Sequence, residues 1–359
     1  MTRLCDPMPL CHGKAMPNRL MLAPLTNLQS NPDGTLGDDE YRWLTRRAEG
    51  GFGLTMTCAA HVQACGQGFP GQLGIWSDDH LPGLSRLAAG INAAGSLSAV
   101  QLQHSGRRAI KELVKSPIVC PWDDAETGAR ALTTMEVEQV IEDFILAALR
   151  AERAGFHGAE LHGAHGYLVG QFLDGENNRR NDGYGGSLED RQRMLFAVID
   201  GIRERCGPEF QLGLRLSPER FGITIAEARA TAERAMAGGK IDYLDMSLWD
   251  VFKEPLEEAY KGKPLIAHFV DLPRGDCRLG VAGKIMGAAQ AQACLDAGAD
   301  YVLIGRGGIL HHDFARRVIA DPQFESVARP VSREYLSGES LGEMFIEYIE
   351  TNWKDFVAP

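Results

Sequence analysis

A short segment of the sequence combines two histidines and a tyrosine. Residues 160–174 read ELHGAHGYLVGQFLD, which places His162, His165 and Tyr167 close behind a short apolar run. Imidazoles and phenols can bind metals, donate hydrogen bonds or transfer protons. The segment alone therefore leaves metal binding, acid–base chemistry and plain packing open.

Zinc is the metal that this spacing would suit. Two histidines three residues apart would share one face of a helix, and zinc sites use such pairs. The loop offers no third ligand after His162 and His165. The eight cysteines show no C-x-x-C pair or other zinc or iron–sulfur spacing. We therefore predict that the protein has no metal site.

The elements that must position these side chains alternate between apolar strands and amphipathic helices. The expected strands are Arg19–Leu25, Gly53–Cys58, Leu97–Gln103, Phe156–His162, Phe210–Leu216, Ile241–Ser247, Arg278–Gly283 and Asp300–Arg306. Eight strand-then-helix units without a linker predict an α/β fold, a single (β/α)8 TIM barrel that spans residues 1–359 as one domain. A doubly wound open sheet is the alternative, but no G-x-G-x-x-G follows a strand.

Helix signals support this assignment. Capping residues precede three of the expected helices: Thr133 with Glu136, Ser187 with Asp190, and Thr224 with Glu227. A helix over roughly Leu310–Ala320 should follow the last strand. Residues 331–359 are predicted to form a helical tail that packs on the barrel base or reaches a partner subunit.

Active-site groups of such barrels lie where the strands end. The expected strand ends carry Gln101, His162, His165 and Arg215 and almost no carboxylates, which argues against glycosidase or divalent-metal chemistry. A charge within the apolar strand of Arg215 is costly unless paired. Gln101 and Arg215 together would suit a flat heterocycle edged with carbonyls and N–H groups.

Two glycine-containing loops predict a phosphate site. Residues 305–308 read GRGG after the last strand, and VAGK (residues 281–284) ends the strand before it. Bare backbone N–H groups and a guanidinium suit a phosphate, which barrels often bind at these two loops. Tight turns are the alternative for either loop alone. Phosphate and heterocycle together suggest a flavin.

Several motifs, in the same order along the chain, resemble the Old Yellow Enzyme family of FMN-dependent ene-reductases. They are NRLMLAPLTN (residues 18–27), QLQHSGR (101–107), HGAHGYL (162–168), NRRNDGYGGSLEDR (178–191) and LIGRG (303–307). The resemblance covers roughly residues 17–320. It departs at Leu28, where some bacterial relatives carry a tyrosine, and at Thr26, where the same branch carries a cysteine.

The resemblance implies a role for individual residues. Residues that would bind FMN are Ala23, Pro24, Leu25, Thr26, Ala59, Gln101 and Arg215 at the ring, and Gly283, Gly305 and Arg306 at the phosphate. His162 and His165 would bind the substrate's electron-withdrawing oxygen, and Tyr167 would donate a proton. The resemblance thus implies a reductase of electron-poor C=C bonds that uses FMN and NADPH or NADH. A nitro or nitrate-ester reductase and a flavin-binding redox sensor remain alternatives.

Bulk properties exclude other classes of partner. A formal charge of −11 disfavours nucleic acid, because phosphate backbones require a basic face. No apolar run approaches the length of a membrane span, and the N-terminus does not resemble a signal peptide. The scattered cysteines suit reduced thiols. We expect a cytoplasmic enzyme of small-molecule substrates, and a homo-oligomer is compatible with the sequence.

Overall fold

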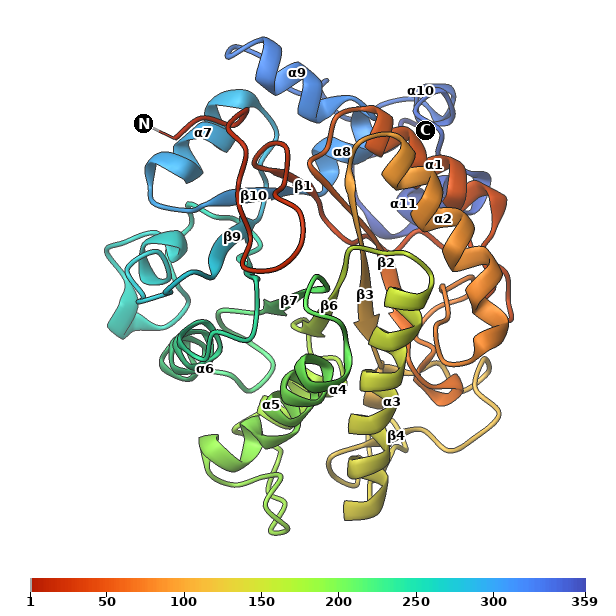
Figure 1. The fold of residues 1–359 in the computed structure, drawn as a ribbon, viewed down its shortest axis with the longest axis vertical. Helices are drawn as coiled ribbons and strands as arrows, with labels where there is room; N and C mark the ends of the chain where they lie inside the picture. Colours follow the sequence, from red (N-terminus) through yellow and green to blue (C-terminus); the bar gives the residue numbers. More distant parts are fainter. Residues whose placement is uncertain (1) are drawn as a thin grey trace.

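Eight parallel strands close into a barrel in the computed structural model, which describes residues 2–359 (Figure 1). Around the barrel the order is β1, β10, β9, β8, β7, β6, β3 and β2, and β1 also pairs with β2. The strands are β1 (Leu20–Leu22), β2 (Leu54–His61), β3 (Leu97–Gln103), β6 (Gly158–Gly163), β7 (Gln211–Leu216), β8 (Tyr243–Ser247), β9 (Arg278–Ala282) and β10 (Tyr301–Ile304). The predicted (β/α)8 barrel is confirmed.

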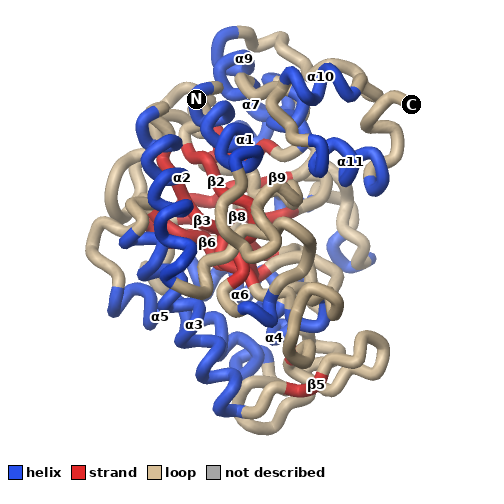
Figure 2. The backbone as a smooth tube through the Cα atoms, turned by 90° about the vertical axis from the view of Figure 1, so that its right-hand side faces the viewer, coloured by secondary structure: helices blue, strands red, loops and turns tan. Residues whose placement is uncertain are grey.

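Helices surround the strands, as Figure 2 shows in blue around red. They are α1 (Asp38–Glu49), α2 (Leu81–Ala93), α3 (Thr134–Arg153), α4 (Leu168–Leu173), α5 (Leu188–Arg205), α6 (Ile225–Ala237), α7 (Ala288–Asp296), α8 (Arg306–Leu310), α9 (Phe314–Ala320), α10 (Arg333–Gly338) and α11 (Glu343–Asn352). A small pair, β4 (Val119–Cys120) and β5 (Arg130–Ala131), lies in the long connection after β3. Within residues 2–359, no helix has the length and apolar character that crossing a membrane requires.

The three predicted helix caps are confirmed. The side chains of Thr133, Ser187 and Thr224 each accept a hydrogen bond from a backbone N–H in the first turn of α3, α5 and α6. Each cap satisfies an N–H group that the helix itself leaves without a partner, which fixes where the helix begins. These local signals need no tertiary contact, so the sequence alone could locate them.

Among the differences from the predicted element boundaries, two bear on the site. The helix expected over Leu310–Ala320 is two helices, α8 and α9, because the backbone at His311 is extended between them. Hydrogen-bonded β1 comprises three residues only, and the chain after it leaves the sheet. Both differences matter, since they place the start of α8 and residues 23–26 beside the central cavity.

Two tyrosines fill the barrel interior below that cavity. Tyr243 on β8 and Tyr301 on β10 are fully buried, and their ring centroids lie 6.1 Å apart in an edge-to-face arrangement. A Cβ atom at Gly213 would lie 2.0 Å from the Tyr243 ring, and one at Gly280 would lie 2.2 Å from the Tyr301 ring. Glycines on the neighbouring strands therefore create the space for both rings, which close the interior as a packed core.

The C-terminal tail lies beside α1 and reaches the mouth of the barrel. Phe345 on α11 packs edge-to-face on Trp43, and Arg47 donates to the carbonyl oxygen of Glu339 at 2.7 Å. Tyr348 and Trp353 line the cavity at the carboxyl ends of the strands. The expectation that the tail packs on the barrel base is therefore wrong. Contact between the tail and a partner subunit remains a prediction.

Candidate active site

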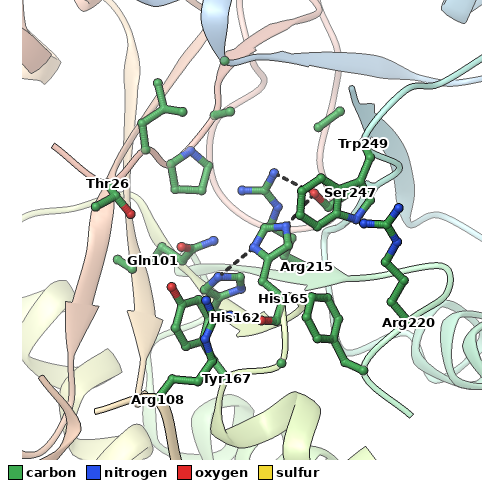
Figure 3. A pocket seen from close by; sticks show the side chains of 18 of the residues that line it. Thr26, Gln101, Arg108, His162, His165, Tyr167, Arg215, Arg220, Ser247 and Trp249 are labelled. Atoms are coloured by element: carbon green, nitrogen blue, oxygen red, sulfur yellow. Dashed lines mark hydrogen bonds between the residues drawn. The ribbon is translucent and has the colours of Figure 1, made fainter. Parts of the chain in front are cut away.

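A cavity of about 1200 Å³ opens at the carboxyl ends of the barrel strands. Figure 3 shows polar side chains from several strands converging on it. All the residues with a predicted role line this one cavity: Ala23, Pro24, Leu25, Thr26, Ala59, Gln101, His162, His165, Tyr167, Arg215, Gly283, Gly305 and Arg306. Barrel closure thus brings residues 23 and 306 of the chain to one site.

The two histidines contact each other. His162 lies on β6 and His165 in the loop that follows, so the pair does not share a helix face. Nδ1 of His165 lies 3.3 Å from Nε2 of His162. In residues 2–359, no group of three or more histidine, cysteine, aspartate or glutamate side chains is arranged to hold a metal ion. The geometry therefore gives the pair a hydrogen-bonding arrangement and no set of metal ligands.

A hydrogen-bond chain orients the histidine pair. Nη2 of Arg215 donates to Oγ of Ser247 at 3.2 Å, and the same Oγ lies 2.8 Å from Nε2 of His165. Because a guanidinium can only donate, the Ser247 hydroxyl accepts from Arg215 and can give its own proton to His165. His165 would then carry its proton on Nδ1 and donate it to His162. Nδ1 of His162 is buried and has no partner among the described residues.

Burial keeps both imidazoles neutral. Desolvation lowers the pKa of His162 and the pKa of His165 well below 6.5, and the positive charges of Arg215 and Arg108 act in the same direction. At neutral pH each ring therefore carries one N–H group, and its second nitrogen is an acceptor. Neutral rings of this kind can donate a hydrogen bond to an oxygen without serving as strong acids.

Tyr167 stands beside this pair at the start of α4. Its ring centroid lies 5.1 Å from that of His162, and the guanidinium carbon of Arg108 lies 4.7 Å from the Tyr167 ring. Gly166 before it has φ +67°, and a Cβ atom there would lie 2.6 Å from the Phe221 ring. The positive φ and the lack of room for a Cβ atom both require glycine at position 166. This backbone conformation fixes where the phenol of Tyr167 points.

Two buried carboxylates lie beneath the predicted ring-binding residues. Nε2 of Gln101 donates to Oε1 of Glu160 at 2.8 Å, and Nε of Arg215 lies 2.7 Å from Oδ2 of Asp245. Both carboxylates are completely buried. Asp245 on the adjacent strand β8 thus supplies Arg215 with a counter-charge that the sequence analysis did not name, and contact of Arg215 with a heterocycle stays a prediction.

Burial raises the pKa of both carboxyl groups. The pKa of Glu160 is raised to about 8, chiefly by desolvation and also by the negative charge of Asp245, while Arg215 opposes the shift. Desolvation likewise raises the pKa of Asp245 to about 6, against the attraction of Arg215. Glu160 is therefore the acid that retains its proton near neutral pH. Protonated Glu160 beside ionised Asp245 avoids two like charges in a dry interior.

Sequence reasoning missed Glu160 and Asp245, although a signal was present. Each is a lone acid within an apolar strand, in AELH and YLDMS, and a buried acid requires a partner as much as a buried arginine does. Strand order places β7 between β6 and β8, so Arg215 has an acid-bearing strand on both sides. Applying the same argument to Glu160, Arg215 and Asp245 would have predicted that these three charged residues on adjacent strands lie together.

The opposite side of the cavity has the composition of a phosphate site. Gly283 directly follows β9, and Gly305 directly precedes Arg306 at the start of α8. A Cβ atom at Gly305 would meet only Leu25, at 3.6 Å, so the backbone there is accessible. A smaller adjoining cavity is lined by Lys284, Arg306 and Arg329 among others. Open backbone and clustered cations suit a dianionic group.

The residues present fit FMN. The hydroxyl of Thr26, the amide of Gln101 and the guanidinium of Arg215 match a ring edge of carbonyl and N–H groups, and the cations near Arg306 match a phosphate. A cavity of about 1200 Å³ exceeds what a single drug-sized ligand needs. It therefore has room for a flavin and a second molecule stacked beside it.

The tail adds two aromatic residues to the cavity that sequence reasoning did not assign. Trp353 lies with its ring centroid 5.3 Å from the guanidinium carbon of Arg306, and Tyr348 lines the same space. No local signal places these residues at the site, because they follow the last barrel strand by more than forty positions. Only the path of the tail past α1 brings them to the mouth.

An eight-stranded barrel with this cavity is compatible with a flavin-dependent oxidoreductase. Residues 3–326 match the NADH:flavin oxidoreductase / NADH oxidase family, and the chain belongs to that family. A probable NADH-dependent flavin oxidoreductase of Bacillus subtilis, YqiG, is 33% identical over 344 residues, which cover 92% of each chain.

Solved structures agree with this assignment. Morphinone reductase in complex with tetrahydroNAD has a TM-score of 0.78 and 29% identity, with 94% of each chain covered. An Old Yellow Enzyme homologue from Zymomonas mobilis has a TM-score of 0.80 and 26% identity, with 94% of this chain and 98% of that chain covered. The predicted resemblance is confirmed, and the protein is an NAD(P)H-dependent flavin oxidoreductase whose flavin is FMN.

Proposed function

We propose that the protein reduces the C=C bond of electron-poor alkenes such as enones, enals, maleimides and nitroalkenes. The observation that carries this proposal is that the His162 ring lies 5.1 Å from the Tyr167 phenol ring and 5.0 Å from the ring of His165, in a cavity that fits a flavin. These groups complement an oxygen that becomes negative and a carbon that becomes basic as an activated alkene accepts hydride.

The residues of the chain have separate tasks in this reaction. Bound FMN would supply the hydride that originates from NADPH or NADH. His162 and His165 would hold the carbonyl or nitro oxygen and stabilise its growing negative charge, with the oxygen replacing Nε2 of His162 as the acceptor for the Nδ1–H of His165. Tyr167 delivers a proton to the neighbouring carbon, because phenols hold their proton at neutral pH yet release it over a short distance. Ser247 and Arg215 fix which nitrogen of His165 carries the proton.

The proposed cofactor contacts follow from the lining of the cavity. The residues assigned to the flavin ring are Ala23, Pro24, Leu25, Thr26, Ala59, Gln101 and Arg215, and those assigned to the phosphate are Gly283, Gly305 and Arg306. Thr26 would place its hydroxyl near O4 of the ring, and Asp245 would hold Arg215 against the opposite edge. Binding and orientation are thus assigned to the chain, and electron transfer to the flavin.

Turnover of cyclohexenone by a Tyr167→Phe variant tests this proposal. Loss of a general acid should lower the rate of the oxidative half-reaction by about 10²- to 10⁴-fold, while bleaching of the flavin by NADPH stays unchanged. Tyr184→Phe is the matched control, because Tyr184 packs against Phe172 and does not line the cavity. Its rates should equal those of the parent protein.

Other outcomes would assign a different function. Unchanged cyclohexenone reduction in Tyr167→Phe would reject the phenol as proton donor. Turnover confined to nitro compounds or nitrate esters would instead indicate reductive removal of those groups. A flavin that NADPH and NADH bleach, but that no alkene, nitro compound or nitrate ester reoxidises, would favour a redox-sensing role.

A further inference from the structure

Four arginines at the cavity mouth each lie on an aromatic ring. The pairs are Arg107 with Trp122, Arg108 with Tyr167, Arg220 with Trp249, and Arg306 with Trp353, at 4.7–5.9 Å between guanidinium carbon and ring centroid. All eight residues line the same cavity. Because the whole chain has a formal charge of −11, this local concentration of positive charge is opposite to its surroundings.

Two of these arginines have no carboxylate partner. Arg107 forms ion pairs with Asp124 at 2.8 Å and with Glu126 at 2.6 Å. The proposed function assigns Arg306 to the flavin phosphate. Arg108 and Arg220, by contrast, have no acid within 4.0 Å in residues 2–359, and both are exposed. Their charge is therefore available to a ligand.

These two arginines flank the proposed catalytic residues. Figure 3 shows Arg108 beside Tyr167 and Arg220 beside Trp249, with the two histidines between them. Nη1 of Arg108 also donates to the backbone oxygen of His165, which ties its guanidinium to the loop that carries that ring. Both guanidiniums line the cavity that also holds the two histidines.

The backbone near Arg220 is held in a conformation that side chains rarely adopt. Arg220, Phe221 and Trp249 have φ of 74°, 55° and 63°, and His165 has φ of 60°. Residues other than glycine pay for such φ values, and these conformations concentrate at functional sites. Phe221 is held against Gly166 of the catalytic loop. The chain thus fixes Arg220 over Trp249 in spite of the strain.

We infer that Arg108 and Arg220 form an anion clamp that binds a phosphate or carboxylate group on the molecule stacked beside the flavin. A guanidinium that lies on a ring keeps its in-plane N–H donors free for such a group. Asp174 and Glu176 are the carboxylates that line the same cavity. Asp174 is held by the backbone N–H groups of Glu176 and Asn177, and the charges of both carboxylates oppose the two guanidiniums, which have no acid of their own within 4.0 Å in residues 2–359.

This inference rests on the proposed function and adds that one of its two substrates, the reductant or the alkene, carries an anionic group that the arginines bind. The anion could belong to the reductant, as the phosphates of NADPH, or to the oxidant, as a carboxylate on the alkene. Both present the same chemistry to the arginines. The two half-reactions separate them, because each exposes the clamp to one substrate at a time.

The experiment compares charged and neutral substrates in each half-reaction. The holoenzyme variants are Arg108→Gln, Arg220→Gln and their combination, with Arg108→Lys and Arg220→Lys to restore charge. Arg179→Gln is the control for net charge, because Arg179 is exposed and does not line the cavity. Flavin bleaching is followed with NADPH and with neutral N-benzyl-dihydronicotinamide. Flavin reoxidation is followed with 3-oxocyclohex-1-ene-carboxylate and with neutral cyclohexenone.

We expect the double glutamine variant to raise the apparent Kd of one charged substrate by roughly tenfold, while its neutral counterpart changes within about twofold. The lysine variants should recover most of this loss, and 1 M salt should abolish the difference, because exposed charges are then screened within about 3 Å. The half-reaction that responds identifies the source of the anion. Equal changes for charged and neutral substrates, or no change in either half-reaction, would overturn the clamp.

Failure of the proposed function would look different. In that case the parent holoenzyme would reduce neither enone, whatever its charge. Binding of tetrahydro-NADP, which cannot donate hydride, is then measured by calorimetry on the parent and on the double variant. Roughly tenfold weaker binding by the variant would support the clamp without any alkene chemistry, and equal binding would reject it.

Discussion

Arginines at the bottom and at the mouth of the same cavity are held in opposite ways. Arg215 is buried on β7, and Asp245 lies 2.7 Å away as its ion-pair partner. Arg220 is exposed at the mouth, and its neighbour is the face of Trp249. Deep in a barrel, an unpaired charge would cost several kcal/mol, so the chain supplies the counter-charge itself. At the mouth, water stabilises the charge and an aromatic face only needs to orient it.

This contrast separates two functions of the same side chain. A guanidinium whose partner is a fixed carboxylate has a fixed position and can orient a cofactor. A guanidinium on a ring keeps its donors free for a ligand that arrives and leaves. At the bottom, Gln101 and Glu160 form a second buried pair with a fixed hydrogen bond. At the mouth, Arg108 lies on the Tyr167 ring as Arg220 lies on Trp249.

Removing the acid at the bottom should have the largest effect. Asp245→Ala leaves Arg215 buried without its partner, which typically lowers the free energy of unfolding by about 3–5 kcal/mol. Arg220→Ala at the mouth should stay within about 0.5 kcal/mol of the parent, as surface changes usually do. Urea unfolding of both variants, at one fixed FMN concentration, measures the difference. Equal losses in the two variants would contradict the contrast.

Glu160, the other buried acid, should make the free energy of unfolding depend on pH. The unfolded chain deprotonates Glu160 near its ordinary value, about 4.3, whereas the folded chain keeps that proton up to about pH 8. Between those values the folded state binds more protons, so the free energy of unfolding falls as pH rises, by up to roughly 1.4 kcal/mol per pH unit.

Glu160→Gln removes this dependence and can still accept from Gln101. We therefore expect the parent to lose stability relative to this variant from pH 6.5 to pH 8. That window lies above the pKa of about 6 at Asp245. The histidines titrate near pH 6.5 in the unfolded chain, but they do so in both proteins and cancel in the difference between parent and variant. Parallel thermal unfolding curves of parent and variant give the difference at each pH. A constant difference across the window would show that Glu160 is ionised throughout.

The smallest effect should come from the ring at the mouth. Trp249→Ala removes the surface under Arg220 but leaves its charge, which should weaken tetrahydro-NADP or carboxylate binding only about two- to fivefold. Stability should hardly change, because 45% of the Trp249 side-chain surface is exposed. Calorimetric titration of the variant measures the loss. Binding as weak as in Arg220→Gln would mean that the ring, and not the guanidinium, holds the ligand.

The sequence predicted the barrel and the residues of the site because these depend on local signals. Apolar strands recur before amphipathic helices, and capping residues such as Thr133 and Thr224 mark where helices begin. Once the barrel was inferred, its geometry required the strand ends to surround one space. His162 and Arg215 could therefore be assigned to the same cavity while their contacts were still unknown.

Partners from other elements could not be predicted in this way. Asp245 is thirty positions from Arg215, and Tyr348 and Trp353 reach the mouth only because the tail passes beside α1. Trp249 meets Arg220 through two loops whose backbone conformations leave no periodic trace in the sequence.

The sequence by itself determined the fold and which polar side chains lie at the strand ends, and the resemblance of its motifs implied FMN and the roles of the two imidazoles and the phenol. Only the tertiary structure decided which charges are already paired and which remain free for a ligand. The physical reason is the distance along the chain over which each effect acts. Hydrophobic periodicity and capping act over a few residues, whereas the state of a charge depends on burial and on neighbours from distant elements.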